Sequence, residues 1–128
     1  MLILFSLTTD FSDQFDQYIN LTHYTVVLYM EHDCSYCDNP GLIFRDVQLY
    51  FDKRDDILLG LASCSKNNNI CISQNVNQIP QLIFYEDGFR KAIYLGPWNV
   101  QVLIEWVLLN TGELIIQKSD NKNISQQQ

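Results

Sequence analysis

Basic residues are scarce in this sequence, and their scarcity limits the partners that it can attract. Eight Lys and Arg residues stand against 15 Asp and Glu residues, which gives a formal net charge of -7. No basic patch interrupts this acidic background. The composition therefore argues against nucleic acid and against anionic membrane surfaces as partners.

Long apolar runs are also missing. No stretch approaches the roughly 20 apolar residues that cross a bilayer, so the sequence predicts no membrane span. The opening, MLILFSL, has no basic residue and no small-residue cleavage site, and we interpret it as a strand over residues 2–7 rather than as a signal peptide. With 128 residues, 47% of them apolar, the chain can form one domain with one core. We expect that domain to cover residues 1–114 and the polar residues 115–128 to form a disordered tail.

Strands and helices are expected to alternate along the domain. The run YTVVLYM, residues 24–30, is aromatic, β-branched and almost wholly apolar, which is typical of a strand buried on both faces. Asp87-Gly88 lies between two apolar segments and predicts a tight hairpin. The other expected elements are helices over residues 11–20, 42–51 and 100–111, one short helix within 64–78, and strands over 57–62, 81–86 and 90–95. This order, β-α-β-α-β-α-β-β-α, predicts an α/β fold with a central mixed sheet flanked by helices.

Two cysteines, Cys34 and Cys37, follow the buried strand in the pattern C-x-x-C. The carboxyl end of a central strand is where open α/β sheets place reaction sites. A dithiol exchange site needs an exposed thiolate that attacks a disulfide and a second thiol that resolves the mixed disulfide. On the first turn of a helix, the N-terminal sulfur faces free N–H groups that lower its pKa. We therefore assign Cys34 as the nucleophile and Cys37 as the resolving thiol.

Two other interpretations of this pair stay open. The cysteines can be inert buried thiols, or they can be half of a zinc site. The further zinc ligands would be His32, Cys64 and Cys71, which qualify only by count because none has the spacing of a zinc finger. We expect no metal and no cofactor.

Four segments together resemble the thioredoxin fold, and more closely the catalytic type of domain in protein disulfide isomerases. They are YTVVLYMEHDCSYC, CSKNNNIC, VNQIPQLIFYEDG and YLGPWNVQVLIEWV. C-x-x-C alone is a weak motif, but here Ile-Pro and an Asp-Gly hairpin follow about 43 residues later. The resemblance covers residues 2–112 and implies a thioredoxin-like domain.

The resemblance also implies a client-binding surface beside the cysteines. In the family the proline corresponding to Pro80 is in cis and lies against the C-x-x-C, which leaves the backbone of Ile79 to bond an incoming peptide as an added strand. Client polypeptides would then dock near Tyr36, Ile79 and Pro80. Without the resemblance, we would prefer to explain Pro80 as the end of a short helix or the start of an edge strand.

Cys64 and Cys71 are interpreted as structural. The resemblance implies a disulfide between them in an oxidising compartment, and two free buried thiols are the alternative if the chain is cytosolic.

Several positions depart from the family. The tryptophan before the first cysteine is replaced by Asp33, the histidine inside the pair by Tyr36, and the basic residue after the pair by Asp38. A carboxylate that the family buries under the site is replaced by Leu28. Pro40 comes three residues after Cys37, and we expect it to kink or delay the following helix.

The charge changes all act on Cys34 in the same direction. Glu31, Asp33 and Asp38 raise the cost of a thiolate, so we expect a higher Cys34 pKa and a weaker oxidant than a standard isomerase. His32 offsets this only if its ring turns over Cys34, and we interpret it instead as an exposed polar residue.

The sequence therefore supports two functions. The first is a thiol–disulfide oxidoreductase or isomerase that acts on cysteine-containing client polypeptides and exchanges electrons with a redox partner such as glutathione or an oxidase. The second is a weakly catalytic or non-catalytic module that binds clients in the cis-proline groove. Resemblance places the chain in the endoplasmic reticulum lumen or secretory pathway, and the cytosol stays open because neither a clear signal peptide nor a retention signal is present.

Overall fold

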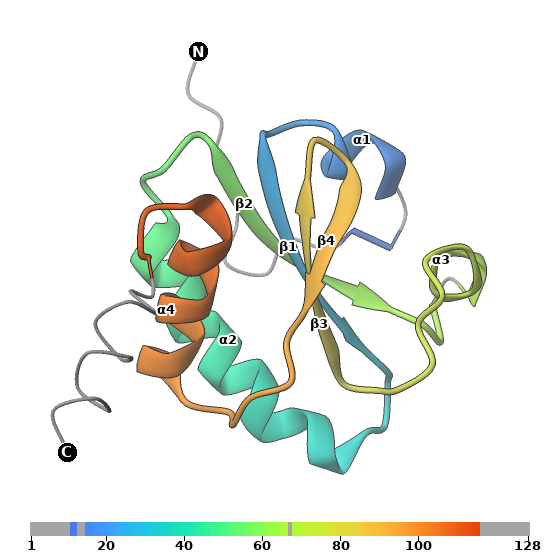
Figure 1. Ribbon diagram of the computed structural model, residues 1–128. Helices are drawn as coiled ribbons and strands as arrows, with labels where there is room; N and C mark the ends of the chain where they lie inside the picture. Colours follow the sequence, from blue (N-terminus) through green and yellow to red (C-terminus); the bar gives the residue numbers. More distant parts are fainter. Residues whose placement is uncertain (1–10, 13–14, 67, 116–128) are drawn as a thin grey trace, which may run out of the picture.

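The computed structural model describes residues 11–12, 15–66 and 68–115 (Figure 1). The expected strand at residues 2–7, and the expected tail beyond residue 115, lie outside the described residues. In chain order the elements are α1 (Phe15–Ile19), β1 (Tyr24–Met30), the 3-10 turn η1 (Ser35–Cys37), α2 (Asp38–Phe51), β2 (Ile57–Ser63), α3 (Asn68–Ser73), β3 (Gln81–Glu86), β4 (Phe89–Ile93) and α4 (Val100–Thr111).

A single mixed sheet with the strand order β2-β1-β3-β4 forms the centre of the described fold. β1 runs parallel to β2 and antiparallel to β3, and β3 and β4 form an antiparallel hairpin. This arrangement confirms the predicted α/β class. It also brings the carboxyl ends of β1 and β2 and the beginning of β3 to one edge of the sheet.

Helices cover both faces of the sheet. α2 and α4 pack together on one face, while α1 and α3 lie on the other (Figure 1). β1 serves both cores, since Val26 and Leu28 face α2 and α4 whereas Val27 and Tyr29 face α1 and α3. The strand predicted to be buried on both faces is therefore confirmed. Among the described residues, no helix has the length and apolar character needed to cross a membrane.

The predicted hairpin turn is confirmed by the backbone, and the structure shows how both ends of α4 are capped. Asp87 and Gly88 both have positive φ, 52° and 85°, as a type I′ hairpin turn requires. The N-cap of α4 is Asn99, whose side chain accepts a hydrogen bond from the Val102 N–H. The helix ends at Gly112, which has φ 85° and donates its N–H to the last carbonyls.

Two helix predictions were wrong at their beginnings. The helix expected over residues 11–20 is shorter, because the Phe11 N–H bonds to the Leu61 carbonyl at 2.6 Å and the Phe11 side chain is fully buried. The helix expected from residue 42 begins at Asp38, so Pro40 neither delays nor ends it. Proline is tolerated there because the N–H groups of a helix's first turn have no partner within the helix.

Because Gly60 of β2 has no side chain, the Phe11 ring packs directly against the strand at this position. A Cβ at this position would overlap the Phe11 ring. We expect Gly60→Ala to destabilise the protein by about 1–3 kcal/mol, as overpacking of a filled core does. Urea unfolding would measure this as a lower midpoint.

Gly41→Ala is the matched control. Gly41 lies in α2, and its Cβ would meet only the sulfur of Met30 in β1 at 3.7 Å, an ordinary van der Waals contact. Alanine in a helix interior is expected to stabilise by about 0.5–1 kcal/mol. Equal midpoints for the two variants would contradict the account of Phe11.

Candidate active site

A short turn after β1 presents the cysteine pair. Asp33 has a positive φ of 57°, in the left-handed region that Asp and Asn enter more readily than most residues. Cys34 follows in an extended conformation and caps η1, and the Cys37 N–H donates to the Cys34 carbonyl at 3.1 Å. Cys37 in turn caps α2. The prediction of a cysteine pair at a strand-to-helix junction is confirmed, with Cys34 just ahead of the first helical turn.

Cys34 and Cys37 form a disulfide, with an S–S distance of 2.13 Å and a Cα–Cα distance of 5.2 Å. The exposed fractions of the two residues are only 8% and 5%. Both residues nevertheless line an open groove of about 950 Å³ between α2 and the ends of β1 and β2. A reactant would therefore reach the pair through this groove rather than across an open surface.

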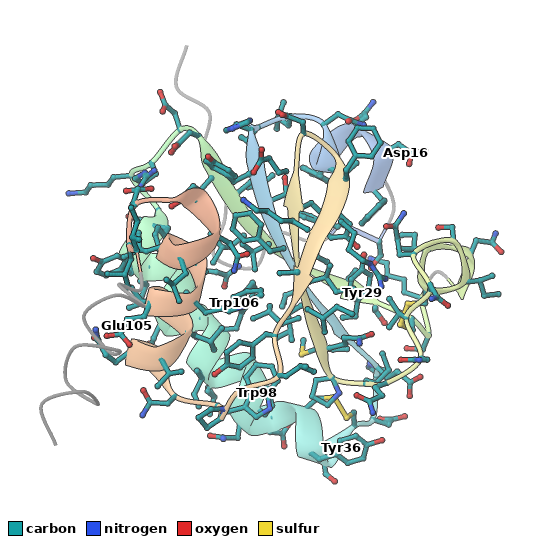
Figure 2. All side chains as sticks on the ribbon, viewed as in Figure 1. Asp16, Tyr29, Tyr36, Trp98, Glu105 and Trp106 are labelled. Carbon is teal, nitrogen blue, oxygen red and sulfur yellow. A yellow bond between two sulfur atoms is a disulfide. The ribbon has the colours of Figure 1, made fainter. Side chains whose placement is uncertain are left out.

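Ile79 and Pro80 lie on the other side of β1. The peptide bond between them is cis. Gln81 is paired with Tyr29, which places Pro80 beside the end of β1 where the cysteine loop begins. Tyr36 is 66% exposed, and Figure 2 shows its ring pointing outward from η1, just ahead of α2. The three residues assigned to client docking thus lie near the same edge of the sheet, but the groove that contains both cysteines is lined by a different set.

The second cysteine pair is joined to the same edge. Cys64, in the loop after β2, and Cys71, within α3, form a disulfide with a Cα–Cα distance of 5.6 Å, and both are buried in the core on the α1 and α3 face. The Cys64 N–H donates to the Met30 carbonyl at 2.9 Å, which continues the pairing of β1 with β2. The disulfide therefore ties the loop after β2 to α3, while the Cys64 N–H holds the same loop at the end of β1.

Ser65 is a residue that sequence reasoning missed. Its hydroxyl oxygen accepts a hydrogen bond from the His32 N–H at 3.0 Å and contacts the Ser63 hydroxyl at 3.0 Å. This bond connects the loop after β2 to the turn that carries Cys34. The sequence could have indicated this contact, because β1 and β2 are parallel and the loops that follow parallel strands meet at one edge of the sheet.

Acidic side chains surround the opening of the groove. Glu31, Asp33 and Asp38 all line it and are all exposed. His32 is exposed as expected, with its side chain 85% accessible and its Nε2 3.9 Å from an Asp33 carboxylate oxygen. Asp38 occupies the first turn of α2, where a carboxylate offsets the positive helix end.

Leu28 stands where the resemblance leads us to expect a buried carboxylate. Leu28 is fully buried in the core between the sheet and α2. A nearby polar group is the amide of Gln48, which lines the groove and donates to the Leu59 carbonyl at 3.0 Å. An amide binds and orients neighbours but does not take up a proton near neutral pH.

Comparison with solved structures identifies the fold. The J-Trx1 fragment of ERdj5 superimposes with a TM-score of 0.71 at 20% identity, covering 81% of this chain and 51% of the other. The zinc-bound form of human ERp44 gives a TM-score of 0.72 at 17% identity over 80% of this chain and 29% of that one. Oxidised thioredoxin from Plasmodium falciparum gives 0.66 at 16% identity, covering 78% of this chain and 94% of the thioredoxin. The chain is a thioredoxin-fold protein.

Sequence comparison relates this thioredoxin-fold protein to protein disulfide isomerases. Protein disulfide isomerase-like 5-1 of Oryza sativa subsp. japonica is 27% identical over 74 residues, which are 58% of this chain and 50% of that protein. DnaJ homolog subfamily C member 10 of Xenopus laevis is 26% identical over 97 residues, 74% of this chain and 12% of the relative. The chain thus spans half or less of the length of these relatives. No protein-family model matches it.

The bond from His32 to Ser65 gives a prediction about the turn before Cys34. Ser65→Ala removes the acceptor, and losing a hydrogen bond of about 1 kcal/mol is expected to speed amide exchange at His32 about fivefold. Hydrogen exchange followed by NMR would measure this. Ser65→Thr keeps the hydroxyl and should keep the wild-type rate. Identical exchange in all three proteins would show that Ser65 does not hold the turn.

Proposed function

We propose that this protein is a thiol–disulfide oxidoreductase that acts on cysteines of client polypeptides. The observation that carries the proposal is the Cys34–Cys37 disulfide, which lines an open groove at the junction of a central strand and a helix. Similarity to protein disulfide isomerase-like 5-1 supports the same class of activity.

The reaction proceeds by two thiol–disulfide exchanges. In the reducing direction, the Cys34 thiolate attacks a client disulfide, a Cys34–client mixed disulfide forms, and the other client sulfur leaves as a thiolate. The Cys37 thiolate then attacks the Cys34 sulfur, releases the remaining client sulfur, and restores the Cys34–Cys37 disulfide. The client gains two electrons and the pair loses two. Glutathione would then reduce the pair for another reducing cycle. Run in reverse, the same steps oxidise a client dithiol and leave the pair reduced, and glutathione disulfide or an oxidase then reoxidises it.

Client binding involves the two sides of the cysteine loop. Tyr36 offers an exposed aromatic surface, and Ile79 and Pro80 form the strand end beside Met30. We assign these three residues to docking of the client backbone as an added strand. We assign Cys64 and Cys71 to stabilising the fold, since both are buried in the core on the α1 and α3 face.

A client-binding module with little catalysis is the second candidate. Three observations favour it: Cys34 is only 8% exposed, carboxylates surround the opening of the groove, and Leu28 occupies the place under the pair. Without a titratable group there, deprotonation of Cys37 depends on solvent, and we expect the resolving step to be slow.

The pairing of the cysteines also supports a location in an oxidising cellular compartment. All four are paired in two disulfides, one of them buried beside α3. Such bonds persist mainly in oxidising compartments. Together with the resemblance to protein disulfide isomerases, this supports the endoplasmic reticulum lumen or secretory pathway over the cytosol.

Insulin reduction separates the two candidates. The wild-type protein is expected to accelerate the reaction, and Cys34→Ser is expected to reduce it to the uncatalysed rate because the attacking sulfur is gone. Cys37→Ser should accumulate a mixed disulfide, visible by mass spectrometry. The double variant Cys64→Ser/Cys71→Ser is the control, expected to lose about 2 kcal/mol of stability but to stay active while folded. Absence of activity in the wild type would favour the binding module.

The redox potential tests the effect of the acidic groups. A thiolate at Cys34 is disfavoured by nearby carboxylates, so the disulfide should be harder to reduce than that of protein disulfide isomerase, whose potential is about -180 mV. Equilibration with glutathione would measure it. Asp33→Asn keeps a residue that tolerates positive φ while removing the charge, and it should make the pair more oxidising. A wild-type potential near that of the isomerase would refute the charge argument.

A further inference from the structure

The groove that contains both cysteines is lined by both apolar and charged side chains. Met30 and Leu61 contribute apolar surface from the ends of β1 and β2, and Leu42, which is 65% exposed, contributes it from α2. This groove lies on the β2 side of β1, whereas Pro80 precedes β3 on the opposite side. It is therefore a second surface beside the disulfide, distinct from the cis-proline edge.

The charges along the groove are unevenly distributed. Glu31, Asp33 and Asp38 belong to the turns that carry the cysteines, and all three are exposed. The cation of the lining is Arg45, seven residues beyond Asp38 and thus about 10 Å further along α2. Charges separated by more than about 8 Å are largely screened at physiological ionic strength. Arg45 therefore leaves the field around the disulfide negative.

We propose that this groove binds a basic segment of the client, so that the protein prefers disulfides whose cysteines are flanked by Lys or Arg. The inference rests on the proposed oxidoreductase function and names its substrate class. A Lys or Arg side chain next to the client cysteine meets carboxylates from Glu31, Asp33 and Asp38, while its alkyl stem covers the apolar surface of Leu42. An acidic flank would instead be repelled. Complementary charge acts chiefly on the rate of encounter, and this rate is where the preference is expected.

Matched peptide disulfides provide the test. Two peptides of the same sequence, with Lys or with Glu on both sides of the disulfide cysteine, are reduced by the fully reduced wild-type protein. The second-order rate constant is expected to be roughly tenfold higher for the Lys peptide at low ionic strength, and the ratio should fall towards one in 0.5 M salt.

Variants that lack the carboxylates test whether the groove causes the preference for the Lys peptide. In the triple variant Glu31→Gln/Asp33→Asn/Asp38→Asn, the ratio of the two rate constants should fall close to one. Taking the ratio cancels any change in Cys34 reactivity, because both peptides meet the same thiolate. The control triple Asp46→Asn/Asp52→Asn/Asp55→Asn removes the same charge from exposed positions outside the groove and should keep the wild-type ratio.

The outcomes separate this inference from the function on which it rests. If both peptides react at equal rates with the wild type, the charge preference is wrong and the oxidoreductase function stands. If the control triple loses the preference as much as the groove triple, overall charge rather than the groove is responsible, and the inference is overturned. If neither peptide reacts, the proposed function fails and the inference falls with it.

Discussion

The pairing of β1 with its two neighbours determines where every part of the candidate site lies. Parallel pairing with β2 continues through the bond from the Cys64 N–H to the Met30 carbonyl, which brings the loop after β2 against the cysteine turn. Antiparallel pairing with β3 places Pro80 at the same edge. A shift of β1 by one residue would exchange its two buried faces, moving Val26 and Leu28 away from α2. The hydrophobic pattern of β1 therefore fixes the register and, with it, the neighbours of Cys34.

Local signals predicted the elements whose structure depends on local chemistry. The apolar run of β1, the Asp87-Gly88 turn and the end of α4 at Gly112 all matched their sequence signatures, because sterics and capping decide them. The beginnings of α1 and α2 did not match. Phe11 is held by a contact with Gly60 on a distant strand, and Pro40 is harmless only because of its position within the first turn of α2. Such facts depend on tertiary packing or on the exact start of a helix, which periodicity does not reveal.

The candidate site was likewise predictable only in part from the sequence. The spacing of Cys34 and Cys37 indicated the chemistry, but their low exposure and the groove that reaches them come from the packing of α2 against β1 and β2. The resemblance to protein disulfide isomerases implied that clients bind on the side of β1 that carries Pro80. The open groove lies on the other side, where the sequence shows only ordinary residues such as Leu42 and Leu61. Asp33 has two roles that the sequence did not separate, since its side chain adds charge while its backbone adopts the left-handed conformation that turns the chain into Cys34.

The acidic groups thus connect reactivity with substrate choice. Under the proposed function, we expect them to disfavour the Cys34 thiolate in the free protein and, by the same field, to slow its encounter with anionic thiols. A client segment that brings Lys or Arg into the groove neutralises that field where it acts. The cost of the thiolate then falls in the complex relative to the free protein, so that the correct client lowers the barrier to its own exchange reaction. With Leu28 in place of a buried carboxylate, the charge of the client takes on part of the electrostatic role that the protein itself lacks.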